Sequence, residues 1–577
     1  MTVRVPCFVG RHVFQDLIRA QRGYFRNFAV HARQAASKGA VAQARGSDYE
    51  DRVRSLQERG DLDRCYPSWP PSEARRRLIS LHSLRQKFDR SLQANGIADE
   101  TLQIHGRVVS RRMAGSKLVF YDIEDTGESP HPRIQIMCNY RSMADHVKDQ
   151  DDFKATCQML RPGDYIGVLG RPEKSSKGEL RVLAQELPML LSPCLHQLPD
   201  QITDEETVSR RSHLRMRMDP QFLRNVKLRS KVEEELAVLL KRRGMVQVRT
   251  PILASHASGA AAEPFETGSK ALSGEKLALR IAPELFLKRL MVGGMTKIFE
   301  IGPAFRNEGI DALHNPEFTI CEFYLEAARL DDLMRDTEKL FSELQDEIFS
   351  YLQRSGAETP HMPSLQGQYP ELHFCATLER EIAKAINGYR LPDLMDPTAA
   401  DELRALYGRL SFDLPSGPTL PRLLDDLCKR FIEPLCERPT WITHHPAVLS
   451  PLAKSFDSEG QRISARAELF VNGQELVNCY EEENSPFKQR SKFLQQLKFH
   501  EEAGGGEEMP IGASSRFKSG IDESYIEALE WGMPPTGGWG CGMDRLIMLF
   551  AGATNIRDVL PFGNLKNVAA MGKPWRT

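Results

Sequence analysis

The sequence predicts an α+β protein with several domains, in which a small β-barrel precedes a larger domain of strands and helices. The chain has 577 residues, which is more than one hydrophobic core ordinarily organises. Between residues 103 and 191, short runs of alternating apolar and polar side chains are separated by Gly, Pro and charged residues, a pattern typical of an all-β unit. After residue 220, stretches with helical periodicity alternate with strand-like ones, which indicates a second, mixed domain.

The composition is that of a folded protein without a membrane span. Hydrophobic residues make up 41% of the chain and charged residues 27%, close to globular averages. No apolar run approaches the roughly 20 residues that cross a bilayer, so we expect no membrane partner. The formal net charge is −1, so any contact with nucleic acid must come from local basic patches. The eleven cysteines form no CxxC pair, and we expect a reducing compartment without a structural zinc.

Residues 1–45 differ from the rest of the chain. Eight arginine and lysine side chains accompany a single acid, Asp16, among Val, Phe, Leu and Ala. Arginine-rich segments that lack acids are typical of mitochondrial transit peptides. We therefore predict a mitochondrial presequence and a location in the mitochondrial matrix. The alternative is a basic arm that binds nucleic acid.

Residues 46–100 are predicted to form a helical approach segment, and residues 101–197 a barrel. Five short strands with a helical piece at residues 149–160 fit an OB-fold, whose face commonly binds single-stranded nucleic acid. The barrel sequence offers cationic side chains that can bind phosphate and aromatic rings that can stack on bases. These candidates are Arg107, Arg111, Arg112, Lys117, Phe120 and Tyr121. The alternative is an ordinary barrel whose aromatic side chains fill its core.

The second domain is expected at residues 221–565, after a polar linker at residues 198–220. Residues 353–440 are predicted to be a mostly helical insertion interrupted by prolines, and residues 566–577 a C-terminal tail. Two strands are expected at residues 297–306 and 317–327. Side chains two apart share one face of a strand, so Phe318, Ile320, Glu322 and Tyr324 are expected on one face of the second strand. A carboxylate among such neighbours requires a cationic partner.

The loop between these two strands carries Arg306, Glu308 and His314, with Phe318 just beyond it. Arginine grips phosphate oxygens with a forked pair of donors, and phenylalanine can stack on a base. The alternative is a surface ion pair between Arg306 and Glu308, of a kind that is common and weak. Near the C-terminus, four glycines at residues 537–542 precede a predicted helix that begins near Met543. Their pattern suggests a phosphate-binding turn, which is a weak signal by itself.

Three stretches resemble the signature motifs of class II aminoacyl-tRNA synthetases. "KRRGMVQVRTPIL" resembles motif 1, "PAFRNEGIDALHNPEFTICEFY" motif 2 and "GGWGCGMDRLIM" motif 3. Within that class, "SGAAAEPF", "LRIAPELFLKRLMVGGMTKIFEIG" and "HHPAVLSPLAK" are similar to the lysyl-tRNA synthetases, more than to the aspartyl and asparaginyl relatives. The resemblance covers about residues 100–563. It implies a class II catalytic domain, with an antiparallel sheet flanked by helices, that follows an OB-fold which binds the anticodon.

The resemblance also implies roles for individual residues. The catalytic and ATP-binding set is Arg306, Glu308, His314, Phe318, Glu475, Gly540 and Arg545, with Arg306, Glu308, His314 and Arg545 as its catalytic members. The lysine-binding set is Gly259, Glu284, Glu322, Tyr324, Asn478, Tyr480 and Glu482. The magnesium ligands are Glu468 and Glu475, and the anticodon-binding residues are Arg111, Phe120 and Gln135.

The stretch "AELFVNGQELVNCYEEE" predicts a hairpin that turns at Asn472 and Gly473. A regular ladder would put Glu468 and Glu475 on the face opposite to Asn478, Tyr480 and Glu482. For both sets to line one site, a bulge must fall between Glu475 and Asn478. We predict that irregularity.

The function that follows is attachment of lysine to tRNALys with ATP and Mg²⁺, in a protein that forms a homodimer as the family does. Two alternatives stay open at this point. One is a related aspartate- or asparagine-specific ligase. The other is a non-catalytic tRNA-binding protein built on a synthetase scaffold, against which the intact set of arginines and glutamates argues.

Overall fold

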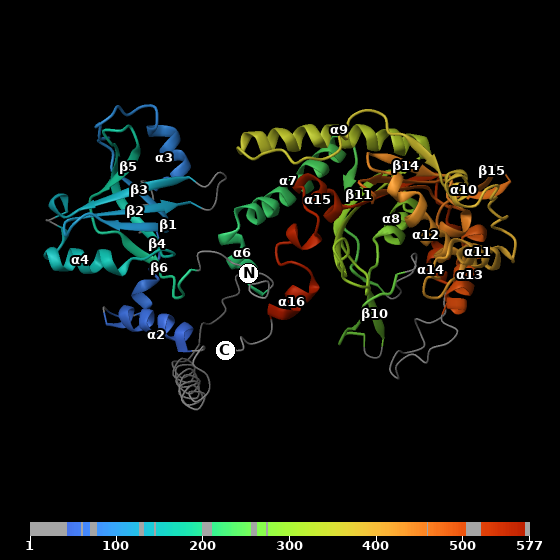
Figure 1. Cartoon of the computed structure of the whole chain (residues 1–577), viewed down its shortest axis with the longest axis horizontal. Coiled ribbons are helices and arrows are strands. Elements are labelled where there is room, and N and C mark those ends of the chain that lie inside the picture. The colour runs from blue at the N-terminus through green and yellow to red at the C-terminus, as the bar shows by residue number, and fades with distance from the viewer. Residues whose placement is uncertain are drawn as a thin grey trace, which may run out of the picture. The chain divides into compact units, whose positions relative to one another are not determined.

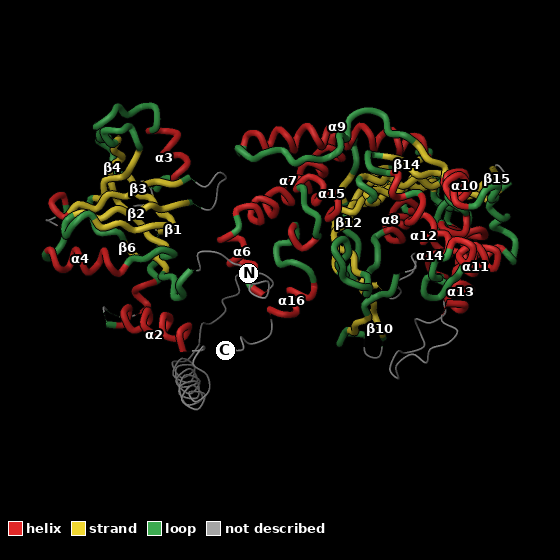
Figure 2. Tube along the Cα trace, in the orientation of Figure 1, coloured by secondary structure: helices red, strands yellow, loops and turns green. Residues whose placement is uncertain are grey.

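The computed structural model describes residues 43–58, 60, 62–69, 78–125, 132–143, 146–198, 210–254, 262–272, 275–458, 460–503 and 521–571. The chain divides into two compact units, residues 1–200 with 575–577, and residues 201–574. Figure 1 labels the elements of both, and Figure 2 separates their helices from their strands. The predicted presequence lies almost entirely outside the described residues. Within the described part of the chain, no helix is long and apolar enough to cross a membrane.

The first unit is a closed barrel, as predicted. Its strands follow the order β1-β2-β3-β5-β4, with β6 beside β4, and pairing of β1 with β4 closes the circle. The α2 helix packs against this barrel, where Arg52 donates to the Asp164 carboxylate at 2.7 Å and both side chains are buried. The elements are α2 (Gln43–Gln57), η1 (Leu62–Cys65), α3 (Leu81–Phe88), β1 (Leu102–Met113), β2 (Leu118–Glu124), β3 (Arg133–Asn139), η3 (Tyr140–Ser142), α4 (Gln150–Met159), β4 (Tyr165–Lys174), β5 (Leu180–Ala184) and β6 (Met189–Ser192).

The second unit is built on an eight-stranded sheet, which is antiparallel except at its two edge strands. Its order is β13-β14-β17-β18-β19-β12-β11-β7. The strands are β7 (Val246–Gln247), β11 (Lys297–Phe305), β12 (Glu317–Glu326), β13 (Glu371–His373), β14 (Thr440–Thr443), β17 (Arg466–Val471), β18 (Gln474–Glu481) and β19 (Thr536–Gly542). Smaller sheets contain β8 (Leu253–Ala254), β9 (Glu266–Gly268), β10 (Lys276–Leu279), β15 (Ser455–Ser458) and β16 (Gln461–Ser464).

Helices cover both faces of this sheet (Figure 1). On one face, α7 and α9 pack with α15 over Phe323 and Trp539 to form the main core. On the other face, α8 packs on β11 and β12 through Leu287 and Met291. The helices of the unit are α6 (Ser212–Met218), α7 (Pro220–Arg242), α8 (Glu284–Val292), α9 (Leu330–Arg354), α10 (Phe374–Ala385), α11 (Ala399–Leu410), α12 (Leu420–Phe431), α13 (Pro486–Ala503), α14 (Glu523–Glu530), α15 (Met543–Ala551) and α16 (Leu565–Met571), with short turns η5 (Glu433–Leu435), η6 (Ala447–Leu449) and η7 (Ile556–Asp558).

The predicted insertion at residues 353–440 contains α10, α11 and α12, which share a core of their own around Leu378, Leu403 and Leu424. The predicted hairpin turns at Asn472 and Gly473, which both adopt positive φ, at 53° and 68°. Such a pair is the signature of a tight hairpin turn that matches the twist of its strands.

The predicted bulge is confirmed. In the β17/β18 ladder, Leu469 pairs with Val477 and Phe470 pairs with Glu475, so Leu476 is an extra residue on β18. A one-residue insertion exchanges the two faces of a strand. It therefore brings Glu475 to the same cavity as Asn478 and Tyr480.

The four glycines before α15 do not form a turn, as their pattern suggested, but belong to β19 in the centre of the sheet. The reason is space. A Cβ on Gly538 would lie 1.8 Å from Oε1 of Glu482 and 2.8 Å from Cε1 of Tyr324. Gly538 therefore leaves room for the side chains of Glu482 and Tyr324 against β19.

Candidate active site

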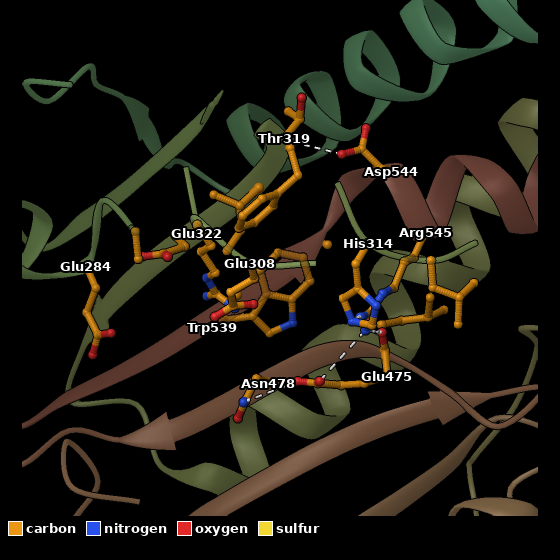
Figure 3. A pocket seen from close by; sticks show the side chains of 18 of the residues that line it. Glu284, Glu308, His314, Thr319, Glu322, Glu475, Asn478, Trp539, Asp544 and Arg545 are labelled. Atoms are coloured by element: carbon orange, nitrogen blue, oxygen red, sulfur yellow. Dashed lines mark hydrogen bonds and ion pairs between the residues drawn. The ribbon is translucent and has the colours of Figure 1, made fainter. Parts of the chain in front are cut away.

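One cavity of about 360 Å³ opens on the sheet face that carries α8. Its walls come from β12, β18, β19, the loop between β11 and β12, and the start of α15 (Figure 3). As predicted, Phe318, Ile320, Glu322 and Tyr324 line it together, while Cys321 and Phe323 point into the core. The strand alternation therefore separates the side chains that support the fold from those that can meet a ligand.

Arg306 lies at the end of β11, and its guanidinium carbon is 5.1 Å from the centre of the Phe318 ring. No ion pair joins Arg306 to Glu308 within the described residues, so the surface-pair alternative fails there. The Nε of Arg306 is buried and without a hydrogen-bond partner among those residues. A buried donor without a partner is expensive. Arg306 also lines the cavity, where the rest of its guanidinium group can meet an anionic ligand.

Arg545 and His314 form a second cationic corner of the cavity, from elements far apart in the sequence. An Nη of Arg545 donates to Nε2 of His314 at 2.8 Å, and Nδ1 of His314 lies 2.8 Å from the Asp311 carboxylate. This pairing makes Nε2 the acceptor and places the proton on Nδ1. The other Nη of Arg545 donates to the Glu475 carbonyl at 2.9 Å, which fixes the side chain across the cavity.

Asp544 supports this corner, although the sequence analysis did not select it. Its carboxylate accepts from Arg229 of α7 at 2.5 Å and from the backbone N–H of Thr319 at 2.9 Å. It thus ties α15 to both α7 and β12 directly beside Arg545. An acid one residue before a motif arginine is a signal that could have found it.

Glu475 and Glu468 are the predicted metal ligands, and only Glu475 lines the cavity. Asn478 lies between them, with its Nδ2 3.4 Å from a carboxylate oxygen of each. Burial and the neighbouring Glu468 raise the pKa of Glu475. Burial would also raise the pKa of Glu468, but Arg466 and His445 outweigh it and lower that pKa to about 2. The donor set fits a divalent cation held chiefly by Glu475 with ligand oxygens, because Arg466 and His445 already occupy both Glu468 oxygens.

The other end of the cavity is acidic. Glu284, at the start of α8, and Glu322 both line it, and the Tyr324 hydroxyl donates to Glu322 at 3.1 Å. Burial and the charge of Glu284 raise the pKa of Glu322 well above its usual value. A cation bound here would relieve both effects. Asn478 and Tyr480 line the same cavity, as expected.

Among the described residues, one predicted lysine-binding residue, Glu482, does not line the cavity. Glu482 is fully buried behind it, where its carboxylate lies 2.5 Å from the Nζ of Lys288. Lys288 thus pairs with Oε2 of Glu482, while Oε1 has no hydrogen-bond partner among the described residues. The assignment of Glu482 to the substrate's ε-ammonium group stays a prediction. Gly259 lies outside the described residues.

Comparison with known proteins agrees with this geometry. The sequence pattern described as "tRNA synthetases class II (D, K and N)" matches residues 204–566, and that of an OB-fold nucleic acid binding domain matches residues 102–190. The mitochondrial lysine–tRNA ligase of Schizosaccharomyces pombe is 35% identical over 90% of this chain and 94% of its own length. The chain belongs to the lysine–tRNA ligase family of class II tRNA synthetases.

Other members of this ligase family are similarly close. The mitochondrial lysine–tRNA ligase of Saccharomyces cerevisiae is 34% identical over 88% of this chain and 91% of its own length. The lysine–tRNA ligase of the bacterium Halalkalibacterium halodurans is 34% identical over 85% of this chain and 92% of its own length. Cytoplasmic members also match, so the comparisons establish the ligase family and leave the compartment open.

The OB-fold of this ligase family member carries Phe120 and Gln135 on its outer face, but not Arg111. Arg111 instead donates to the carbonyls of Gln158 and Leu160 at the end of α4, at 2.5 and 2.9 Å. Arg112 takes its place, with its guanidinium carbon 4.8 Å from the centre of the Phe120 ring. The reason is a bulge at Val109 in β1, which exchanges the faces of the strand beyond it. Arg112, and not Arg111, therefore lies beside Phe120 on this face, and the anticodon role of Arg111 stays a prediction.

Gly538→Ala is expected to destabilise the ligase's second unit by about 1–3 kcal/mol, because the added Cβ would overlap the buried side chains of Glu482 and Tyr324. Thermal denaturation of both proteins measures the effect. Gly268→Ala is the matched control, since an added Cβ there meets no atom within 4 Å. Equal melting temperatures for the two variants would contradict the close packing of β19.

Proposed function

We propose that this protein attaches lysine to tRNALys in two steps, through a lysyl-adenylate. In the first step, a lysine carboxylate oxygen attacks the α-phosphorus of ATP, and the bond to pyrophosphate breaks. In the second, a ribose hydroxyl at the 3′ end of the tRNA attacks the lysyl carbonyl, and AMP leaves. The observation that carries the proposal is one cavity that Arg306 and Arg545 line together with the carboxylates of Glu284 and Glu322.

The chain's own groups act by binding and positioning. Arg306 contacts the α-phosphate and the lysine carboxylate, and neutralises the charge that develops when they join. Phe318 stacks against the adenine, Glu308 accepts from its amino edge, and the backbone at Gly540 leaves room for the nucleotide. Arg545 and His314 bind the γ-phosphate side. No nucleophilic side chain is required, because both attacking oxygens belong to the substrates.

Mg²⁺ is the metal that fits the donor set, since it prefers one or two carboxylates together with phosphate oxygens. Glu475 binds the ion directly, and Glu468 lies farther from the cavity than Glu475. The ion neutralises charge on the phosphates when it is bound.

Selection of lysine follows from the sign of the charge at the acidic end of the cavity. Glu322, held by Tyr324, pairs with the ε-ammonium group, and Glu284 pairs with the α-ammonium group. Asn478 and Tyr480 form the walls. The side chain of aspartate would meet these carboxylates with a like charge, which costs several kcal/mol, and that of asparagine would leave Glu322 buried without a cation.

The OB-fold binds the anticodon of tRNALys. Support comes from the outer face that Arg112, Phe120 and Gln135 share, which offers a cation, a ring and an amide to one base. We expect Arg112→Ala to raise the KM for tRNALys by roughly tenfold, which corresponds to about 1.4 kcal/mol. The KM for lysine in ATP–pyrophosphate exchange should not change.

Arg111→Ala is the matched control, and aminoacylation kinetics compare the two variants. Because Arg111 donates to carbonyls at the end of α4, its loss is expected to lower the stability of the barrel by about 1 kcal/mol. A larger rise in the KM for tRNALys in Arg111→Ala than in Arg112→Ala would contradict this reading of the barrel.

The same ligase is proposed to act in the mitochondrial matrix as a homodimer. The basic segment at residues 1–45 and the mitochondrial relatives support the compartment. Exposed apolar side chains of Val246, Ile252 and Leu253, at one edge of the catalytic unit, support the dimer.

Charging of tRNALys transcripts with radiolabelled lysine tests the proposed function. The protein from about residue 46 onward is expected to form lysyl-tRNA only when ATP and Mg²⁺ are both present. Binding of tRNALys without charging, under conditions in which the bacterial relative charges its own tRNA, would contradict the proposal.

A further inference from the structure

Lys288 is a fully buried cation that belongs to none of the roles described above. It lies one helical turn after Glu284 on α8, and its Nζ contacts Glu284 Oε1 at 2.6 Å and Glu482 Oε2 at 2.5 Å. Lys288 and Glu482 are both 0% exposed, whereas the Glu284 side chain is 14% exposed. The lysine thus connects a carboxylate that no solvent reaches to one that lines the cavity.

A buried ion pair needs an explanation beyond stability. Removal of two charges from water costs about as much as their attraction returns, and apolar residues of similar volume are often equally stable. Burial opposes the charge on Lys288, but Glu284 and Glu482 outweigh it and raise its pKa well above the usual value. The ammonium therefore stays charged, and it holds both carboxylates in place.

The consequence lies at Glu284. The ion pair uses Oε1 of Glu284 and leaves Oε2 for a ligand, while the helical spacing fixes the side chain toward Lys288. Lys288 pairs with Oε2 of Glu482 behind the wall, and the two carboxylates that line this part of the cavity are Glu284 and Glu322. Lysine has two ammonium groups, and each then meets one carboxylate.

We propose that Lys288 is a positioning residue for the substrate's α-ammonium group, which it serves by holding Glu284 in its binding orientation. The inference rests on the proposed function, since it assigns Glu284 to that group. A purely structural role would require Lys288 only to neutralise Glu482. The two roles predict different effects of removing Lys288 from a protein in which Glu482 carries no charge. Only the positioning role predicts a higher KM for lysine.

The test compares Glu482→Gln with the double variant Lys288→Met/Glu482→Gln, because Lys288→Met alone leaves a buried carboxylate unpaired and is expected to unfold. Both variants keep Glu322 and Arg306. ATP–pyrophosphate exchange gives the KM for lysine and for ATP, and thermal denaturation checks that both proteins fold. As a second probe, 6-aminohexanoate is measured as a competitive inhibitor, since it has the carboxylate and the ε-ammonium group of lysine but no α-ammonium group.

From the single to the double variant, we expect the KM for lysine to rise roughly tenfold, the loss of one charge-assisted contact. The inhibition constant of 6-aminohexanoate and the KM for ATP should stay within about twofold. An unchanged KM for lysine would overturn the proposal and leave Lys288 as the counter-ion of Glu482. A parallel rise for lysine and 6-aminohexanoate would also overturn it, because Lys288 would then act on the whole pocket. Failure of the proposed function would appear separately, as wild-type protein without lysine-dependent exchange.

Discussion

Arg306→Ala is expected to lower kcat for ATP–pyrophosphate exchange by roughly 10²- to 10³-fold, the range found when one preorganised donor to a developing negative charge is removed. Arg306 is suited to this task because its buried Nε has no partner among the described residues and its guanidinium lies over Phe318. Among the described residues, no carboxylate forms an ion pair with Arg306, although its charge lowers the pKa of Glu475. The substitution should therefore lower kcat without lowering the stability of the folded protein.

Arg243→Ala is the matched control for Arg306→Ala. Arg243 is also partly exposed, at 23%, but it pairs with Glu343 of α9, away from the cavity. We expect it to retain wild-type exchange and to change the melting temperature as little as Arg306→Ala does. Exchange by Arg306→Ala within threefold of wild type would exclude a direct role of this arginine at the α-phosphate.

Glu322→Gln is expected to raise the KM for lysine by roughly 10²-fold, because a buried charge pair that loses one partner costs about 2–5 kcal/mol. Glutamine keeps the shape of the side chain and can still accept from the Tyr324 hydroxyl. The change thus isolates the charge. The KM for ATP should be unaffected, since Glu322 lies at the acidic end of the cavity and Arg306 at the other.

The control for Glu322→Gln is Glu326→Gln, on the same strand but exposed at its end. It is expected to leave both KM values unchanged. Steady-state exchange at varied lysine, and then at varied ATP, separates the two constants. A Glu322→Gln protein with an unchanged KM for lysine would remove the acidic pocket as the source of amino-acid selection.

The arrangement of the cavity on β12 could be predicted from sequence because strand alternation is local. The two-residue period of a strand predicted that Phe318, Glu322 and Tyr324 share one face, and the structure confirms that all three line the cavity. The bulge at Leu476 could be predicted from a conflict, since two sets of residues required for one site fell on opposite faces of a regular hairpin. The need to bring both sets of residues to one site predicted the bulge, which the alternation of the strand alone did not.

The bulge at Val109 could not be found in this way, because no comparable conflict marks it. Without it, simple alternation along β1 favours Arg111 for the outer face, and with it Arg112 lies there. Lys288 is a different case. Its spacing of four residues from Glu284 was visible, but its contact with Glu482 joins residues almost 200 positions apart and depends on tertiary packing. A spacing of four residues on a helix does not by itself reveal a buried ion pair.

The glycines of β19 show how a local pattern can suggest the wrong element. Glycines weaken an isolated strand, so a turn was the natural expectation. In the folded protein the strand is held on both sides by β12 and β18, and the missing side chains make room for Glu482 and Tyr324. The glycines form a strand because β12 and β18 pair with it, and this long-range pairing cannot be seen in a single sequence.

We propose that one cavity joins lysine to ATP. The most direct test is ATP–pyrophosphate exchange by the purified protein from about residue 46 onward, with lysine, aspartate and asparagine supplied separately. Exchange with lysine alone is the predicted result. Exchange that depends on aspartate or asparagine, or none with any of the three, would contradict the assignment of Glu284 and Glu322 to a lysine pocket.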